Sequence, residues 1–478
     1  MSPTPRGRRK PPPPRPTVRA KAAVSAATVA RRLASAGVEA VILAMVNNAG
    51  VTLVKSIPLH RLEDAARFGI GLSPVFSVFL VDDQITSSPQ IGGPTGDTRL
   101  MPDPAGTVPL AASPGWALAP VDQRDQEGEI YPACTRSFAR SMLERLGSFG
   151  LELRGGYEVE FFLGHRAMGG LEKEPDPPPA HAGPGYGAIA LVDVEPFAIA
   201  LIRALEEQGT GVMQFHPEYS TGQLELSVPH STGIAVADTN LVVRHTIRAV
   251  ARSRGLAASF APVVFAGLVG NGAHLHLSLW NRAGRNLFNG GRGPEGMTRE
   301  AEAFTAGVLA SMPALTAITC PSVASFQRLQ PHRWSGPWAC WGRENREAAL
   351  RFVTGMIGSR AEAANLEVKA LDPAANPYLA LGAVVAAGID GLERELSLPE
   401  PVTDDPASIS AADRRTLGIR RLPASLGAAI RELERSSLLR GAMGDFLFEA
   451  FLATRRGERA AFETMDPEDM VRAHRWRY

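Results

Sequence analysis

Apolar and polar residues alternate along this chain with a period of two residues in some segments and of about 3.6 residues in others. Up to about residue 120, a helical stretch at 22–36 is followed by short β-rich runs that Gly, Pro and Asp separate. Such runs predict strands joined by turns, and hence a small α+β domain. Strands are expected at 40–45, 51–57, 75–81 and around 107–109.

The rest of the chain mixes period-2 runs with long segments of period 3.6, without a strict βαβ rhythm. This mixture predicts an α+β fold rather than a doubly wound sheet. A polar stretch at 121–128 separates the two parts, so we expect one domain at 22–128 and a second at 129–478. Strands are expected at 156–163, 212–215, 223–228, 274–279, 348–353 and 365–370. Helices are expected at 135–146, 195–208, 240–253, 300–311, 377–393 and 425–435.

Composition and charge narrow the function classes. The 478 residues are 45% hydrophobic and 21% charged with a net charge of +1, which is typical of a soluble globular protein and favours neither nucleic acid nor membrane as a partner. Residues 1–21 are basic and proline-rich, so we expect a disordered arm there. The longest strongly apolar run, at 41–46, is far short of a membrane span, and the start of the chain lacks a signal-peptide pattern. Three cysteines without CxxC spacing favour a reducing compartment, so we expect the cytoplasm.

Carboxylates recur inside segments that otherwise have the pattern of buried strands. Glu158 and Glu160 stand two apart, and period-2 geometry aims both at one face. A lone ExE pattern is also common on a solvated strand face, but the apolar residues that follow Glu160 continue the strand into the core. The two carboxylates should therefore be enclosed and need a cation. A turn-containing stretch then delivers Glu218 at its start and Glu225 inside the next strand.

Two later strands add imidazoles and a further acid. Alternation puts His274, His276 and Ser278 on one strand face, and Glu367 and Lys369 on one face of another. An HxH pair alone also fits a packed core pair or a zinc half-site. Together, however, these segments offer five or six carboxylates and one or two imidazoles, with hardly a cysteine nearby. Such an oxygen-rich set suits Mg²⁺ or Mn²⁺, and more than one ion.

An arginine-dense segment follows, with Arg328, Arg343, Arg346 and Arg351. Guanidinium groups bind carboxylate and phosphate oxygens bidentately, so arginines beside two metals suggest phosphoryl transfer to an acidic small molecule. For any one of them, a surface arginine patch is the alternative. The sequence has no Walker A motif, no GxGxxG after a strand and no GxSxG, so a nucleotide must be held another way.

The motifs as a set, in this order, resemble the glutamine synthetase family. They are the ExE strand, the Glu218 and Glu225 pair, the GxGxHxHxS strand, the NRxxxxR element at 345–351, the strand at 365–369 and Asp-Pro-Ala-Ala-Asn-Pro-Tyr-Leu at 372–379. The resemblance runs from about residue 37 to the C-terminus. It implies a small N-terminal β-grasp domain, a large catalytic domain with a curved antiparallel sheet, and a dodecamer of stacked rings with active sites between subunits.

The resemblance also implies ATP as co-substrate, two or more Mg²⁺ or Mn²⁺ ions per site, and a γ-glutamyl phosphate that an amine attacks. The implied metal ligands are Glu160, Glu218 and Glu225 for one ion and Glu158, His274 and Glu367 for the other. The implied ATP-binding residues are His276, Ser278, Arg346 and Arg351, of which Arg346 and Arg351 are also the catalytic pair. The implied substrate-binding residues are Gly270, Arg328, Arg346 and Lys369.

Three departures from the family pattern point to an altered amine site. The ammonium-binding Asp of an Asp-Gly-Ser-Ser turn has no clean counterpart at 84–93, and the flap Glu is absent from the bulky, basic segment 328–334. Lys369 stands where the family carries Arg. A small cation needs compensating charge when it is desolvated, so this site should bind ammonium poorly. We therefore expect a γ-glutamyl amide ligase for an amine larger than ammonia, with Trp334, Trp338 and Trp341 as candidate pocket residues.

Three other functions are compatible with parts of this pattern. One is glutamine synthetase itself, with the missing acids replaced from elsewhere in the fold. A second is a non-catalytic, nitrogen-sensing paralogue, although such a protein has no physical need for a cluster of mutually repelling buried acids. A third is a zinc hydrolase built on His274 and His276.

Overall fold

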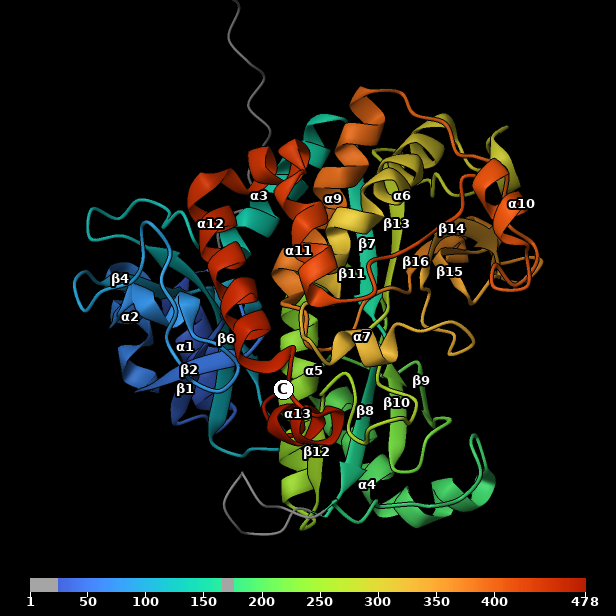
Figure 1. The fold of residues 1–478 in the computed structure, drawn as a ribbon. Helices are drawn as coiled ribbons and strands as arrows, with labels where there is room; N and C mark the ends of the chain where they lie inside the picture. The colour runs from blue at the N-terminus through green and yellow to red at the C-terminus, as the bar shows by residue number, and fades with distance from the viewer. Residues whose placement is uncertain (1–24, 166–175) are drawn as a thin grey trace, which may run out of the picture.

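The computed structural model describes residues 25–165 and 176–478. The arm expected at 1–21 and the first residues of the helix expected at 22–36 lie outside the described residues. Figure 1 shows the N-terminal part beside α12 and a larger part in which β7 leads into β8 through the middle of the molecule. Helices and sheets are mixed throughout, which confirms the predicted α+β class.

The N-terminal part is a six-stranded sheet with the order β2-β1-β6-β4-β3, and β5 pairs with β6. Its parallel β1–β6 pair lies at the centre, and the apolar faces of α1 and α2 pack against it. The strands are β1 Ala40–Val46, β2 Thr52–Pro58, β3 Ile70–Leu72, β4 Thr98–Pro102, β5 Val108–Pro109 and β6 Trp116–Arg124; the helices are α1 Ala26–Ser35 and α2 Leu62–Phe68. The strand expected at 75–81 is wrong, because Pro74 starts a 3₁₀ helix, Pro74–Val78.

The larger part contains two sheets. Seven strands run in the order β11-β7-β13-β16-β15-β14-β17, with all neighbours antiparallel except β14 and β15, and four strands run in the order β12-β8-β10-β9. The strands are β7 Leu151–Tyr157, β8 Val159–Gly164, β9 Gln214–Pro217, β10 Gln223–Ser227, β11 Ser231–Thr232, β12 Ala257–Ser259, β13 Leu275–Asn281, β14 Trp338–Arg343, β15 Ala348–Val353, β16 Asn365–Val368 and β17 Arg420–Arg421.

One predicted strand, at 156–163, is in fact two strands in two different sheets. β7 ends at Tyr157 and pairs with β13, whereas β8 begins at Val159 and pairs with β10 and β12. Glu158 stands at the switch, where its N–H donates to the carbonyl oxygen of His274 at 2.9 Å. Glu158 and Glu160 therefore lie where the two sheets meet, rather than on one face of one strand.

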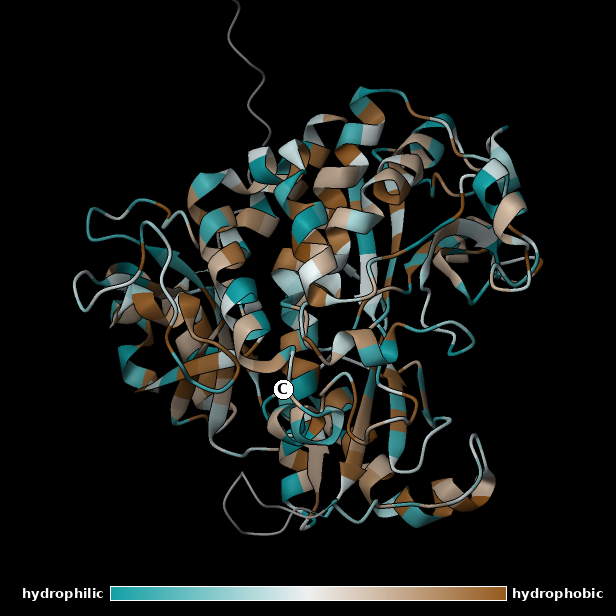
Figure 2. Cartoon of the chain, viewed as in Figure 1, coloured by the Kyte–Doolittle hydropathy of each residue, from teal (hydrophilic) through white to brown (hydrophobic). Residues whose placement is uncertain are grey.

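The helices cover these sheets, and α9, whose bounds match the prediction at 377–393, is their buried centre. Its Asn376 side chain caps the first turn, and the helix packs on α6, α3 and α12. Figure 2 shows apolar residues on the packed segments and hydrophilic residues on the outer turns and loops. The helices are α3 Thr135–Ser148, α4 Ala188–Glu207, α5 Ala235–Arg252, α6 Arg299–Thr319, α7 Ser325–Arg328, α8 Arg360–Ala363, α9 Pro377–Glu393, α10 Ala411–Thr416, α11 Leu426–Glu434, α12 Ser437–Phe462 and α13 Pro467–His474.

Two helices extend beyond their predicted ends because they continue through a proline. The helix expected at 195–208 begins at Ala188 and contains Pro196, and the one expected at 300–311 continues past Pro313 to Thr319. Burial of the flanking apolar side chains compensates for the hydrogen bond that each proline removes. By length and composition, α6 could cross a membrane, but 72% of its most apolar window is buried inside the fold, as in the core helix of a soluble protein.

Candidate active site

Glu367 is the centre of a first cluster of charged side chains on β16 and the adjoining strands. It is 1% exposed, and its two oxygens accept hydrogen bonds from Lys369 Nζ and Arg351 Nη1, each at 3.0 Å. Burial alone would raise its pKa, but the charges of Lys369 and of the neighbouring histidines and Arg351 hold the pKa of Glu367 well below its usual range. The carboxylate therefore remains ionised without a metal.

Two histidines join Glu367 to Glu158. His274 Nδ1 lies 2.7 Å from Glu158 Oε1 and 3.3 Å from Glu367 Oε1. His276 binds Asn365 Oδ1 through Nδ1 at 3.0 Å, and its buried Nε2 has no hydrogen-bond partner among the described residues. Potential ligand atoms of Glu158, His276 and Glu367 all lie within 4.8 Å of one another. Burial opposes ionisation of Glu158, but its hydrogen bond with His274 lowers its pKa to about 2.

A second cluster forms across the four-stranded sheet, where the register places Glu225 opposite Glu160 on one side and His216 on the other. His216 Nε2 lies 3.1 Å from Glu225 Oε1, and His216 Nδ1 lies 4.0 Å from Glu218 Oε1. The Tyr186 hydroxyl donates to Glu218. His216, Glu218 and Glu225 also hold potential ligand atoms within 4.8 Å of one another.

Protons bind tightly to this second cluster because several carboxyl groups are buried close to one another. Burial, reinforced by the nearby carboxylates, raises the pKa of Glu225 to about 8, and burial also raises the pKa of Glu160. The hydrogen bond to Glu225 raises the pKa of His216 to about 9. A divalent cation would compensate the negative charge that these protons now neutralise, so the donor set fits a hard metal ion.

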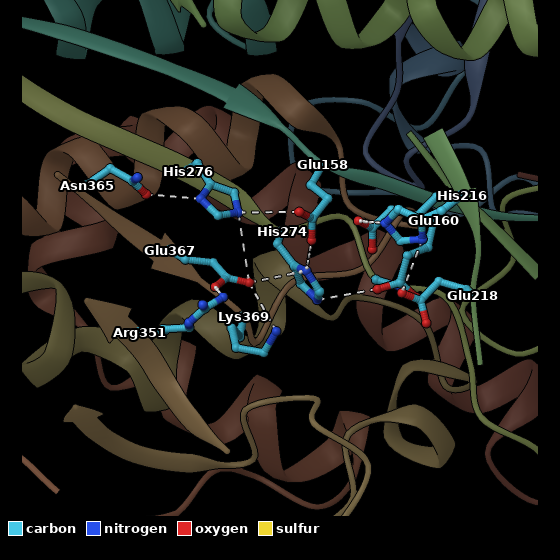
Figure 3. Close-up of polar contacts among 12 residues, drawn as sticks. Glu158, Glu160, His216, Glu218, His274, His276, Arg351, Asn365, Glu367 and Lys369 are labelled. Atoms are coloured by element: carbon cyan, nitrogen blue, oxygen red, sulfur yellow. Dashed lines mark hydrogen bonds and ion pairs between the residues drawn. The ribbon is translucent and has the colours of Figure 1, made fainter. Parts of the chain in front are cut away.

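His274 connects the clusters, as Figure 3 shows. Its Nε2 lies 3.7 Å from Glu160 Oε1 and 3.0 Å from Arg328 Nη2. Glu160 is held from the other side by Gln223 Nε2 at 2.7 Å and by the Gly272 N–H at 2.8 Å. The predicted acids and His274 therefore form one continuous row, although they come from segments more than 200 residues apart.

Two cavities meet at this row, and Glu158 lines both. One of about 590 Å³ is lined by acids of both clusters together with Arg328, Arg346, Arg351 and Lys369. The other, of about 440 Å³, is lined by His276, Ser278 and residues of β7. A phosphoryl donor in one cavity and an acceptor in the other would both face Glu158.

The remaining predicted residues occupy the walls in different ways. Gly270 lies in the larger cavity, where an added Cβ would come within 2.0 Å of the Pro262 carbonyl oxygen, so only glycine fits there. Ser278 accepts a hydrogen bond from Trp280 Nε1 at 2.8 Å. Arg346 is exposed, with its guanidinium carbon 5.9 Å from the centre of the Trp334 ring.

Of the three tryptophans predicted to line the amine pocket, one lines the larger cavity and two lie in the core. Trp334 lines the larger cavity and is 58% exposed. Trp338 and Trp341 are 7% and 0% exposed and belong to hydrophobic clusters, so the expectation that they line the amine pocket is wrong. Both belong to β14, whose alternating side chains pack into the protein on either face.

Sequence reasoning missed His216, Tyr186 and Glu347. His216 stands two residues before Glu218, so the period-2 rule that linked the other acids could have included it. Tyr186 lies in a turn and carries no local signal. Glu347 is inside the arginine-dense segment, but it is 6% exposed and accepts hydrogen bonds from two backbone N–H groups, which no spacing indicates.

Comparisons with known proteins agree along nearly the whole chain. Residues 132–473 match the family model described as "Glutamine synthetase, catalytic domain", and residues 18–127 match "Glutamine synthetase N-terminal domain". The "Gamma-glutamylpolyamine synthetase GlnA3" of Streptomyces coelicolor is 47% identical over 454 residues, which cover 95% of this chain and 96% of that protein. The "Glutamine synthetase" of Methanocaldococcus jannaschii is 34% identical, over 69% of this chain and 71% of that protein.

Solved structures share the whole architecture. One, "Crystal structure of novel glutamine synthase homolog", superposes with a TM-score of 0.80 at 35% identity and covers 92% of this chain and 99% of that one. Another, "GmaS/ADP complex-Conformation 1", gives a TM-score of 0.78 at 28% identity, with 92% and 97% covered.

Proposed function

The chain belongs to the glutamine synthetase family, and from that premise we propose that it joins glutamate to a polyamine or another amine larger than ammonia. It is an ATP- and divalent-metal-dependent ligase that forms carbon–nitrogen bonds between small molecules. The choice of amine rests on the residues that form one wall of the larger cavity. His332, Arg333 and Trp334 stand there, and the segment 328–334 contains no carboxylate.

The residues of the two clusters are proposed to hold the metals. Glu160, Glu218 and Glu225 would hold one ion, with His216 as an additional ligand that the structure suggests. Glu158, His274 and Glu367 would hold the other, and His276 is a second imidazole candidate, because its Nε2 lies 3.7 Å from Glu158 Oε2 and 3.9 Å from Glu367 Oε1. When bound, the ions supply positive charge that offsets the charge on the transferred phosphoryl group.

The two cavities define the proposed path of the reaction. ATP would occupy the smaller cavity beside His276 and Ser278, and glutamate the larger one beside Gly270 and Arg328. Transfer of the γ-phosphoryl group to the glutamate side chain gives γ-glutamyl phosphate and ADP. Attack by the amine nitrogen on the acyl carbon then forms the C–N bond, breaks the C–O bond to phosphate and releases a proton.

Cationic side chains are proposed to guide both steps. Arg351 and Lys369 lie in the wall of the larger cavity and hold Glu367 between them. Arg346, exposed at the same wall, is free to reach a phosphate oxygen, and Arg328 beside His274 is placed for a carboxylate. Because fixed positive charges stabilise the charge that develops on the phosphoryl oxygens, these groups would lower the barrier without transferring a proton themselves.

The assembly is also part of the proposal. We infer a dodecamer of stacked rings in the cytoplasm, in which a domain at 22–128 completes the site of a neighbouring subunit built from 129–478. Two observations support the two domains and a contribution of a neighbouring subunit to the site. The two family models divide the chain between residues 127 and 132, and within the described ranges no residue of 84–93 lines either cavity of its own subunit. The mass of the purified protein by light scattering tests the subunit number.

Phosphate release tests the reaction itself. The purified protein is given ATP, Mg²⁺ and L-glutamate with ammonium, ethanolamine, putrescine or spermine, and the amide product is identified by mass spectrometry. We expect an organic amine to give a kcat/KM at least about tenfold above that for ammonium, a difference of about 1.4 kcal/mol in transition-state binding. A higher value for ammonium would instead identify a glutamine synthetase, and no turnover with any amine would favour a regulatory paralogue.

A further inference from the structure

The larger cavity is bordered by a loop with an unusual backbone, residues 330–336, which we call the Trp334 loop. It connects α7 to β14 and contains two residues with positive φ that are not glycine, His332 at 61° and Trp334 at 51°. Residues with a side chain rarely adopt this left-handed conformation, and they keep it only where the surroundings hold it in place. Something in the structure must therefore fix the loop.

Glu347, directly after Arg346, provides that hold. Its Oε1 accepts a hydrogen bond from the Trp334 N–H at 2.7 Å, and its Oε2 accepts one from the His332 N–H at 3.2 Å. The two bonds reach the two left-handed residues, one oxygen each. Since the side chain is 6% exposed, water competes little for these bonds.

The backbone that carries this carboxylate is held by the side chain of Asn345. Asn345 Oδ1 accepts the Glu347 N–H at 3.1 Å, and Asn345 Nδ2 donates to the carbonyl oxygens of Val402 at 2.8 Å and Asp404 at 3.0 Å. The backbone at Glu347 is thus anchored, through Asn345, to the segment that follows α9.

Outer contacts hold the loop against the cavity rim. Arg333 donates to the carbonyl oxygens of Leu268 at 2.6 Å and Gly267 at 2.9 Å, and Arg421 donates to Gln330 Oε1 at 2.7 Å. His332 Nδ1 also lies 3.2 Å from Asp405 Oδ2, and the Ser335 hydroxyl donates to the Gln330 carbonyl oxygen at 3.0 Å. Glu347 differs from these contacts in that it binds the backbone N–H of both left-handed residues. The result is a half-exposed indole ring at the cavity mouth.

We propose that Glu347 is a positioning residue for amine selection, and that it acts by holding the Trp334 ring where the carbon chain of an organic amine packs on it. This inference rests on the proposed function. An aromatic face attracts both methylene groups and an ammonium group, whereas ammonium ion itself has no chain to pack. Loss of the hold should therefore weaken the binding of organic amines more than the binding of ATP and glutamate, which the Trp334 ring affects only through Arg346.

The experiment compares Glu347→Ala and Glu347→Gln with the wild type, using ATP, glutamate and either putrescine or ammonium. Glu347→Ala should raise KM for putrescine about tenfold, because two hydrogen bonds to the loop are lost, while KM for ATP and glutamate changes less than about twofold. Glu347→Gln keeps one carbonyl acceptor, so its KM for putrescine should lie between the values of the wild type and Glu347→Ala. KM for ammonium should remain at its wild-type value.

A matched control is Asp125→Ala. Asp125 also accepts two backbone N–H groups, those of Glu127 at 3.0 Å and Glu129 at 2.8 Å, but in a hairpin of the N-terminal sheet. Its removal should leave every KM at the wild-type value. A similar rise of KM for putrescine in this control would overturn the inference.

A double-mutant cycle with Trp334→Ala tests whether Glu347 acts through the ring. If it does, Glu347→Ala adds no further loss of putrescine selectivity when Trp334 is already alanine. Additive losses, or a fall of kcat with KM for putrescine unchanged, would refute the inference while the proposed function stands. A wild type that uses only ammonium refutes the proposed function instead. If Glu347→Ala does not fold, Glu347→Gln enters the same cycle.

Discussion

Metal binding to the second acid cluster should release protons, and the number released should depend on pH. In the metal-free protein, burial raises the pKa of Glu225 to about 8. A carboxyl with that pKa keeps its proton in about nine of ten molecules at pH 7 and in about one of ten at pH 9. Because a metal binds the ionised carboxylate, Mg²⁺ should displace about 0.9 proton from Glu225 at pH 7 and about 0.1 at pH 9.

Neighbouring groups change the size of this release but not its direction. The pKa of Glu160 is also raised by burial, and the hydrogen bond to Glu225 raises the pKa of His216 to about 9. Each proton on these groups must likewise leave if its atom becomes a ligand. Below pH 8 the apparent Mg²⁺ affinity should therefore rise by about tenfold or more per pH unit, and it should level off only above about pH 9, where His216 has also lost its proton.

Calorimetric titration measures this directly. Metal-free protein is titrated with Mg²⁺ at pH 7 and pH 9, each in two buffers with different ionisation enthalpies, and the difference in heat gives the number of protons released. Glu225→Gln should reduce the release at pH 7 by about 0.9, whereas Asp125→Ala should match the wild type, because Asp125 lines neither cavity of its subunit. A release of zero at pH 7, or the same release at both pH values, would refute the reasoning.

Three further outcomes follow from buried charges elsewhere. Glu367→Gln removes the charge that faces Arg351, so phosphate release should fall about 100-fold or more while circular dichroism stays that of a folded protein. Glu458→Ala leaves the fully buried guanidinium of Arg455 without its carboxylate, and chemical denaturation should show a free energy of unfolding lower by about 3–5 kcal/mol. Burial raises the pKa of Asp372 to about 6 from 3.8, so the folded state keeps a proton that the unfolded state loses between these pH values. As pH rises through that window, the wild type should lose about 3 kcal/mol of stability relative to Asp372→Asn, measured by the same method.

Local signals account for what could be predicted of the fold. The bounds of α9 follow from an N-capping Asn376, a proline at the first helical position and an unbroken apolar run. α12 was missed even though it has 26 residues, because Gly444, with φ of 71°, and several charged residues interrupt its pattern. The same reasoning failed at 75–81, where apolar residues in a row form a 3₁₀ turn after Pro74.

Long-range pairing accounts for what could not be predicted. The residues around Glu158 are all compatible with one strand. The strand breaks there because β7 pairs with β13 and β8 pairs with β10, in two different sheets. Both partner strands lie more than 60 residues further along the chain. The family resemblance identified the six acid and histidine ligand candidates without this knowledge. It could not indicate that His274 lies between the clusters or that Glu347 fixes the Trp334 loop.

The partners of the buried acids determine how each cluster responds to pH. In the four-stranded sheet, Glu225 stands opposite Glu160 on one neighbouring strand and His216 on the other. This register carries charged side chains into the core, where each unpaired carboxylate costs stability. Protons lower that cost in the metal-free protein, as the raised pKa of Glu225 shows. Glu367 needs no such proton, because Lys369 and Arg351 already neutralise it. The two clusters should therefore differ in how strongly pH controls their metal affinity, with the Glu225 side the more dependent.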